Sequence, residues 1–336
     1  MELTNSESQK LGEALSQIQY DPNGGARYLA DLRQNALMSL PKRLIELLDQ
    51  QRSSIHPRPY FIIENLPLDK DIYQVPHPSQ YEINAKSGSI SENVIMAMAS
   101  LVGEPYSISF EGSEIVNNLI PTQESRRDFT GIGSEVELDF HIENAALKCL
   151  ETPNYSPLGL LLTGVKYAPQ GPLTRIADAR LALKKLSDIE IQLLRSPLFR
   201  IKVPYRWRNF LGPEQEMTDW ISVLRNGDSY PDVAVAFYKD MVECRSELAQ
   251  KALSSFYNAL REVSISLEIK PGTLVYIDNR FALHSRDHFT ALFDERGISN
   301  RWIQRVFVAP NLWNYRSLEQ VRDRVFRPIR LKESAA

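Results

Sequence analysis

The chain has 336 residues, of which 43% are hydrophobic and 24% are charged, enough apolar side chains for a large globular core. Its net charge of -3 excludes a global positive field that would attract nucleic acid or an anionic membrane. No apolar run approaches the roughly 18 residues of a membrane span, the N-terminal stretch lacks the apolar core of a signal peptide, and Cys149 and Cys244 are too few for a disulfide framework. We therefore expect a cytoplasmic protein without nucleic-acid or membrane partners.

The first part of the chain predicts helices. Over residues 5–52 the apolar side chains recur three and four positions apart, and Pro41 is placed to open a further helix. A short apolar run bounded by prolines at 59–67 indicates a strand that enters the core. Residues 91–105 predict another helix, with Ser91 as its N-cap and a glycine at its end.

The middle of the chain changes to short strands, and helices then return. The expected strands lie at 106–110, 114–121, 136–142, 158–165 and 174–180. Helical spacing returns at 182–196 and 244–263, and three more strands are expected at 264–269, 272–279 and 300–310. The arginine-rich segment 315–336 is expected to be a solvated helix and tail, with a lid or an oligomer contact as the alternative.

These elements predict one α+β domain over residues 1–336. A β core at 106–180 and 263–310 is split by a helical insert at 181–262. A mainly helical layer at 5–105 wraps this core.

"ELDFHIENAAL" contains a His-x-acid pair, His141 and Glu143. Because 42 of 336 residues are acidic, a chance pair of this kind is almost expected among the five histidines. On a strand, however, residues i and i+2 point to the same side, so the two side chains would share a face with Asp139. Two such groups form part of the 2-His-1-carboxylate triad of non-haem Fe(II) oxygenases, which needs a second histidine from elsewhere.

A second histidine follows the buried-strand pattern of "GTLVYIDNRFALHSRDHF". His284 comes just after that strand, and His288, four residues on, is the rival ligand. The separation of 143 positions between His141 and His284 suits opposite ends of a jelly-roll core that an insert interrupts. Composition alone leaves both histidines open.

"NRWIQRVFVAP" is the most unusual segment. Strand alternation places Arg301, Ile303 and Arg305 on one face, while the other face is apolar enough for a central strand. An edge strand with its arginines in solvent is one interpretation. If the arginine face is inward, each guanidinium needs an anion, and two arginines then indicate two carboxylates.

Four segments in this order resemble the clavaminate synthase-like group of Fe(II)/2-oxoglutarate-dependent oxygenases: "GSEVELDFHIEN", "GPLTRIADAR", "GTLVYIDNRFALHSR" and "NRWIQRVFV". The similarity extends more weakly over residues 60–310. This group includes hydroxylases of free L-arginine, L-asparagine and L-lysine. The resemblance implies a double-stranded β-helix (jelly-roll) core and the cofactors Fe(II), 2-oxoglutarate and O2.

The resemblance also implies roles for individual residues. It makes His141, Glu143 and His284 the iron ligands. Thr174 and Arg301 match residues that hold 2-oxoglutarate. The substrate-binding set that it implies is Asn117 near the amino group, Glu143, Asp240 on the side chain and Arg305 on the α-carboxylate.

Two features depart from the relatives' pattern. The distance from His284 to Arg301 is longer by a few residues in "DERGISN". In "FYKDM", Asp240 matches the second of two acids that grip a basic side chain in some relatives, whereas Tyr238 replaces the first. A single acid would suit the ammonium of lysine or ornithine better than a guanidinium.

The expected function is hydroxylation of a free amino acid, polar or basic, with release of succinate and CO2. Glu143 disfavours halogenation, because related halogenases have a small residue there. The alternatives are an oxygenase of this fold acting on a carrier-bound or peptidyl amino acid, one that catalyses desaturation or ring closure, and a non-catalytic jelly-roll scaffold. The sequence leaves the amino acid, the carbon oxidised and the oligomeric state open.

Overall fold

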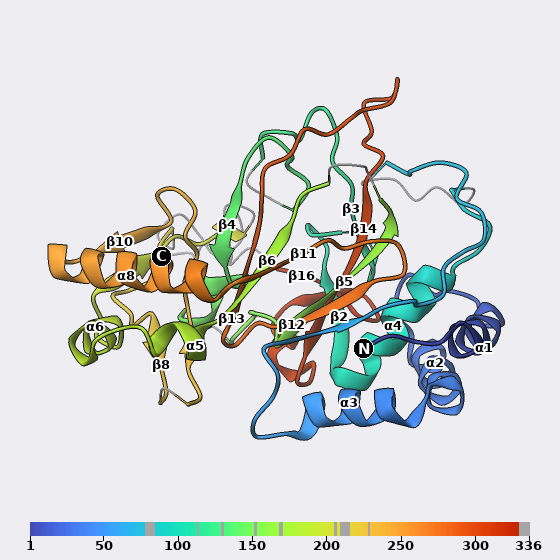
Figure 1. The fold of residues 1–336 in the computed structure, drawn as a ribbon, viewed down its shortest axis with the longest axis horizontal. Coiled ribbons are helices and arrows are strands. Elements are labelled where there is room, and N and C mark those ends of the chain that lie inside the picture. The colour runs from blue at the N-terminus through green and yellow to red at the C-terminus, as the bar shows by residue number, and fades with distance from the viewer. Residues whose placement is uncertain are drawn as a thin grey trace, which may run out of the picture.

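The structure, a computed structural model, describes residues 1–77, 85–112, 114–128, 131–150, 153–167, 171–204, 207–208, 216–227 and 229–328. Two β-sheets stand at its centre, and helices lie to either side of them (Figure 1). The fold is the predicted α+β jelly-roll arrangement. Among the described residues, no helix is long and apolar enough to cross a membrane.

The larger sheet has eight strands. The order of strands across the whole sheet is β1 (Tyr60–Ile63), β12 (Leu274–Asp278), β5 (Gly159–Lys166), β14 (Trp302–Ala309), β2 (Glu104–Ile108), β16 (Val325–Arg327) and β15 (Glu319–Arg322). The eighth strand, β3 (Asn117–Leu119), also pairs with β14. The side chains of the central strands β12, β5 and β14 are almost all buried. Strand β5 shows why both faces are buried. Leu160 and Leu162 join the core between the sheets, whereas Leu161 joins a second core beneath the N-terminal helices.

The smaller sheet is antiparallel and has four strands. Its order is β11 (Ile265–Leu267), β6 (Thr174–Asp178), β13 (Ala282–Arg286) and β4 (Leu138–His141). Apolar residues of β4, β6 and β13 share one core with those of the larger sheet. His284 lies in the middle of β13 and not just beyond a strand, as the sequence pattern predicted, because a turn after β12 starts a new strand at Ala282.

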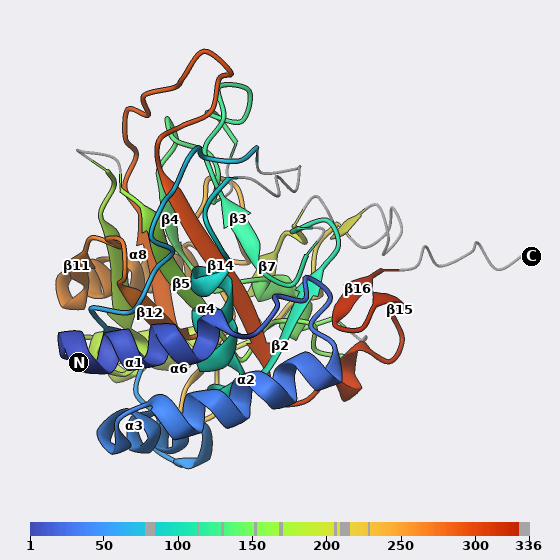
Figure 2. The same ribbon diagram turned by 90° about the vertical axis from the view of Figure 1, so that its right-hand side faces the viewer.

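Four helices cover the outer face of the larger sheet (Figure 2). They are α1 (Asn5–Ser16), α2 (Ala26–Ser39), α3 (Lys42–Ser53) and α4 (Ile90–Val102). A capping box between Thr4 and Glu7 opens α1, and Pro41 is the N-cap of α3, as expected. The N-cap of α4 is Ser89, so the prediction of Ser91 was wrong by two residues, because Ser91 is already inside the helix.

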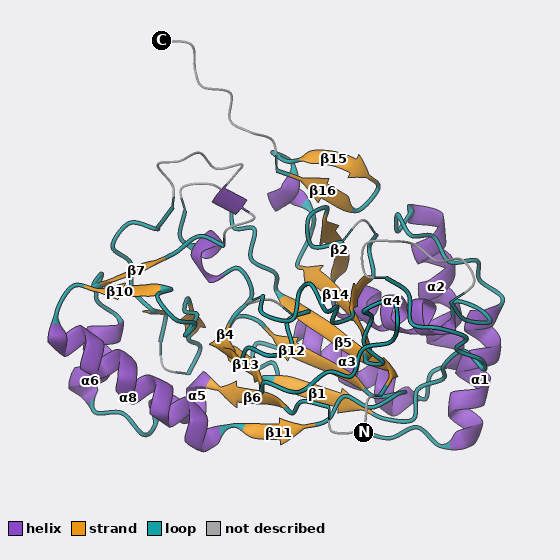
Figure 3. Ribbon diagram, turned by 90° about the horizontal axis from the view of Figure 1, so that it is seen from above, coloured by secondary structure: helices purple, strands orange, loops and turns teal. Residues whose placement is uncertain are grey.

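The insert between the two halves of the core is mixed, not purely helical. Its helices are α5 (Ala179–Leu183), α6 (Asp188–Leu194) and α8 (Glu247–Val263), and they gather on the side opposite α1 to α4 (Figure 3). It also contains β7 (Phe199–Ile201) paired with β10 (Val242–Cys244), and β8 (Leu224–Arg225) paired with β9 (Asp232–Val233). Two single turns of 3-10 helix, Ala145–Lys148 and Trp313–Tyr315, complete the described elements.

The arginine-rich C-terminal segment forms a β-hairpin, so the predicted solvated helix was wrong. Strand β16 adds to β2 in parallel and buries Val325 and Phe326, while its neighbour β15 is exposed throughout. These two apolar residues fix the segment to the edge of the larger sheet. Residues 329–336, the predicted tail, lie outside the described residues.

Candidate active site

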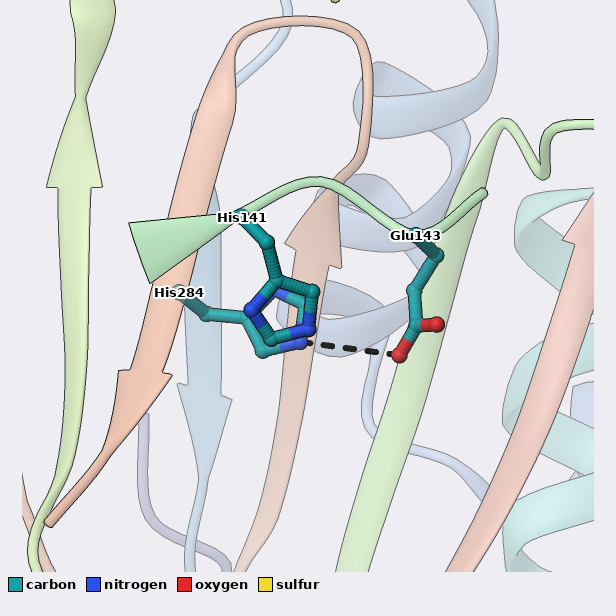
Figure 4. Close-up of side chains that lie close together, drawn as sticks. All are labelled: His141, Glu143 and His284. Atoms are coloured by element: carbon teal, nitrogen blue, oxygen red, sulfur yellow. Dashed lines mark ion pairs between the residues drawn. The ribbon is translucent and has the colours of Figure 1, made fainter. Parts of the chain in front are cut away.

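His141, Glu143 and His284 meet at the end of the smaller sheet (Figure 4). His141 and His284 are directly opposite each other on β4 and β13, and their ring centroids are 4.2 Å apart. One carboxylate oxygen of Glu143 lies 3.6 Å from Nε2 of His284. The ligand atoms of all three residues lie within 4.8 Å of one another, close enough for a single metal ion. The rival ligand, His288, is exposed.

Glu143 reaches this cluster from a turn. Strand β4 ends at His141, and the left-handed Asn144 (φ 54°) turns the chain immediately after Glu143. The carboxylate of Asp139, which was expected on the same face, instead accepts a hydrogen bond from the hydroxyl of Tyr257. The paired geometry of His141 and Glu143 therefore depends on the turn as well as on the strand.

A buried asparagine fixes that turn. Oδ1 of Asn279 accepts a 2.7 Å hydrogen bond from the backbone N–H of Glu143, and its Nδ2 donates to the carbonyl of Glu143 and to Oγ of Ser156. Asn279 is completely buried at the end of β12. Its place after a buried strand is visible in "VYIDN", but this pattern alone does not predict that Asn279 binds the backbone of Glu143.

We predict that Asn279→Ala lowers both stability and metal affinity. The substitution leaves the backbone groups of Glu143 without their partner, which costs about 1–3 kcal/mol in free energy of unfolding. Urea unfolding and Fe(II) titration measure the two effects. Asn35→Ala, in helix α2 and far from the site, is the control, and equal losses in both variants would contradict this role for Asn279.

The protonation states suit metal binding. Burial, together with the nearby His284, lowers the pKa of His141 to about 3, so its imidazole is neutral. Nδ1 of His141 lies 2.8 Å from the carbonyl of Asp139, which leaves Nε2 for a metal. Burial raises the pKa of Glu143, but the interactions with His284 and Arg305 outweigh it and hold the pKa at about 2. Two histidines and an ionised carboxylate on one side are the donor set of non-haem Fe(II) sites.

A cavity of about 300 Å³ adjoins the cluster and lies between the two sheets. The smaller sheet contributes Leu138, His141, Thr174, His284 and Arg286 to its wall, and the larger sheet contributes Leu160, Leu162, Ile303 and Arg305. Its size lies at the lower end of the range for small-molecule sites.

Arg301 is a buried cation in this wall. It is 8% exposed and forms no ion pair with another described residue. It interacts electrostatically with Arg286, whose guanidinium donates to the carbonyls of Asp287 and Val136. Burial and Arg286 lower the pKa of Arg301 to about 9. A guanidinium in this position is stabilised by a bound anion. Thr174 lies opposite Arg286 in the strand register and also lines the cavity.

Sequence reasoning did not include Arg286, although it lies two residues beyond His284 and therefore on the same face of β13.

Arg305 lies beside the metal cluster and is 5% exposed. Its Nη2 donates to Glu111 at 2.9 Å and to Oδ1 of Asn117 at 3.2 Å, and its Nη1 lies 3.7 Å from Glu143. Asn117 is held in place because it pairs with Arg305 in the register of β3 and β14. Glu111 was missed by the sequence analysis, because nothing in "SFEG" indicates that this turn faces the cavity.

Two of the predicted site residues are absent from the described cavity wall, Asn117 and Asp240. Asp240 lies on the surface of the insert. It is exposed and has a left-handed backbone (φ 61°) in the turn that joins Tyr238 to Met241. Its neighbours Lys239 and Met241 line the cavity, but Asp240 itself is absent from the described cavity wall. Tyr238, in contrast, lines the cavity, and its ring centroid lies 4.9 Å from that of His141.

Comparison with known proteins gives consistent matches. Residues 87–307 match the family model described as taurine catabolism dioxygenase TauD, TfdA family. The chain is 27% identical to L-asparagine oxygenase of Streptomyces coelicolor, over 84% of this chain and 81% of the relative. It is 25% identical to L-lysine 3-hydroxylase of Catenulispora acidiphila, over 91% and 82%.

Two solved structures have the same fold. A structure of asparagine oxygenase in complex with Fe(II), 2S,3S-3-hydroxyasparagine and succinate superposes with a TM-score of 0.79 at 24% identity, covering 97% of this chain and 98% of the other. The non-haem iron oxygenase OrfP in complex with Fe and α-ketoglutaric acid gives a TM-score of 0.79 at 21% identity, covering 97% and 99%.

Proposed function

Since the chain belongs to the taurine catabolism dioxygenase TauD, TfdA family and is an iron- and 2-oxoglutarate-dependent dioxygenase, we propose that it hydroxylates a free amino acid. The observation that carries this proposal is the meeting of three groups in one cavity. These are a His-Glu-His cluster, a buried arginine without an anion among the described residues, and a second arginine beside an acid.

We propose that His141, Glu143 and His284 hold the Fe(II). Their donor set fits this ion, as do the neutral imidazole of His141 and the ionised carboxylate of Glu143. When bound, the metal supplies the oxidising chemistry, in which O2 and 2-oxoglutarate give succinate and CO2 and one oxygen atom enters a C–H bond of the substrate. The protein's part is to place the substrates and to keep them away from bulk water.

Arg301 and Thr174 are proposed to bind 2-oxoglutarate. Arg301 is a buried guanidinium that a carboxylate can pair with through two hydrogen bonds, and Thr174 adds a hydroxyl donor to the same wall. The adjacent positive charge of Arg286 strengthens the attraction for a dianion.

We predict that Arg301→Lys raises the KM for 2-oxoglutarate by about 10-fold, because lysine keeps the charge but loses the two-pronged geometry. Steady-state succinate release measures this change. The KM for the amino acid stays the same, and a change confined to the amino acid would contradict the assignment.

Arg305 and Glu111 are proposed to bind the head group of the amino acid. A zwitterion presents one carboxylate and one ammonium, and this ion pair presents one partner for each. Oδ1 of Asn117 accepts a second hydrogen bond from the same nitrogen of Arg305, Nη2, and so helps to fix the guanidinium. Because Arg305 is only 3.7 Å from Glu143, a head group bound here brings the adjacent side-chain carbons close to the proposed iron ligands.

The experiment that tests the function is a substrate panel. Purified enzyme with Fe(II) and 2-oxoglutarate is offered each of the twenty free amino acids, ornithine and citrulline. We expect succinate release together with a product heavier by one oxygen atom for at least one of them. Absence of such a product across the panel would overturn the proposed function.

A further inference from the structure

Three basic side chains line the part of the cavity that the insert contributes. Lys202 follows β7, Arg208 lies in the next described turn, and Lys239 lies in the turn after Tyr238. These segments are joined, because the backbone N–H of Lys202 donates to the carbonyl of Met241 at 2.9 Å. Arg208 is partly buried, and its Nε donates to the carbonyl of Val203 at 2.7 Å.

No carboxylate neutralises these three cations within the described part of the chain. None of Lys202, Arg208 and Lys239 forms an ion pair there. The acid that the sequence predicted for this wall, Asp240, is exposed outside the cavity. The wall therefore offers hydrogen-bond donors and positive charge to whatever occupies it.

This wall is fixed next to the proposed metal site. The backbone N–H of Phe237 donates to the carbonyl of Phe140 at 2.8 Å, and Ala236 forms a bridge with His141. The ring of Tyr238 contacts that of His141 at a tilt of 46°, and its hydroxyl has no hydrogen-bond partner among the described residues. A substrate whose head group lies at Arg305 and whose carbon lies at the metal meets these donors with the end of its side chain.

The balance of charges in the cavity favours an anionic group beside Lys202, Arg208 and Lys239. The described wall contains six basic side chains and two carboxylates, an excess of four positive charges. Fe(II) and the 2-oxoglutarate dianion cancel each other, and the head group of an amino acid is neutral overall. A cationic side chain would increase the excess in a partly desolvated site, whereas a carboxylate would reduce it.

We propose that the substrate is an amino acid with an anionic side chain, of the aspartate or glutamate class, whose distal carboxylate binds Lys202, Arg208 and Lys239. This inference rests on the proposed function and specifies its substrate class. It differs from what a relationship to a lysine hydroxylase suggests, because a lysine side chain would place its ammonium against these cations.

The test compares acids with their neutral isosteres in the holoenzyme. Anaerobic calorimetry with Fe(II) and 2-oxoglutarate gives the Kd of L-aspartate, L-asparagine, L-glutamate, L-glutamine, L-lysine and L-ornithine without turnover. We expect one acid to bind at least about 10-fold more tightly than its amide, with an affinity that falls as salt is added. Equal binding of acid and amide, or tighter binding of lysine or ornithine, overturns the inference and leaves amino-acid hydroxylation standing.

Variants that each remove one positive charge test whether these side chains cause the preference for the acid. Lys202→Gln and Lys239→Gln should each raise the Kd of the preferred acid by about 3- to 10-fold and leave that of its amide unchanged. The effect of Lys202→Gln should be the larger, because Lys202 is partly buried and Lys239 is exposed. Lys184→Gln, on an exposed lysine outside the cavity wall, is the matched control. An acid preference that survives both substitutions contradicts this assignment. Failure of every amino acid to give an oxygenated product would instead overturn the proposed function itself.

Discussion

Replacing His284 with alanine is expected to remove stoichiometric iron and to lower turnover by more than about 100-fold. Removal of a residue that only hydrogen-bonds to a metal ligand can already cost about 100-fold, and His284 is proposed to be a ligand itself. The reason is geometric. His284 lies opposite His141 in the register of two paired strands, so no other described histidine can take its place without moving the sheet. Metal analysis after anaerobic reconstitution and the rate of succinate release measure the two effects.

His288→Ala is the matched control for this prediction. His288 is the same residue type, four positions along the chain, but it is exposed. Its removal should leave iron content and turnover unchanged. If His288→Ala lost as much iron as His284→Ala, or if Glu143→Ala kept full turnover, the proposed triad would be wrong.

The second large effect is expected for Arg305→Ala. Loss of one partner of a buried charge pair costs about 2–5 kcal/mol, which corresponds to a fall in kcat/KM for the amino acid of about 30-fold to several thousand-fold. The KM for 2-oxoglutarate should change little, because Arg301 is the residue proposed to bind it. Arg316→Ala, on an exposed arginine, is the control.

This variant also separates free from carrier-bound substrates. A carrier-bound or peptidyl amino acid has no free α-carboxylate and gains nothing from Arg305. Undiminished substrate binding in Arg305→Ala would therefore contradict a free amino acid as substrate. Thermal unfolding of the variant shows whether loss of the Arg305–Glu111 ion pair has destabilised the fold.

The alternation of side chains between the two faces of a strand explains which parts of the structure could be predicted from the sequence. Alternation along residues 300–310 placed both arginines on one face, and in the structure that face lies toward the cavity while Val306 and Val308 pack beneath the helices. Short apolar runs and turn residues were enough to predict a β core split by an insert, and the resemblance to the oxygenases implied its jelly-roll form. The C-terminal hairpin was missed because its position depends on two apolar residues that bind a strand more than 200 positions earlier in the chain.

Other features depend on local backbone geometry or on distant contacts. The sequence motif placed Asp240 at the substrate, but a left-handed turn carries it to the surface. Glu111 and Asn279 act through partners 194 and 136 residues away, which no local pattern indicates. The basic wall formed by Lys202, Arg208 and Lys239 became apparent only when two separate segments of the insert were seen side by side.

The central claim is that this cavity couples the breakdown of 2-oxoglutarate to oxygen insertion into an amino acid. Turnover of the preferred amino acid under ¹⁸O2 tests it most directly, with mass analysis of both products. We expect one labelled atom in succinate and one in the hydroxylated amino acid, in equal amounts. Succinate formed at the same rate whether or not an amino acid is present, with no label in the amino acid, would contradict the claim.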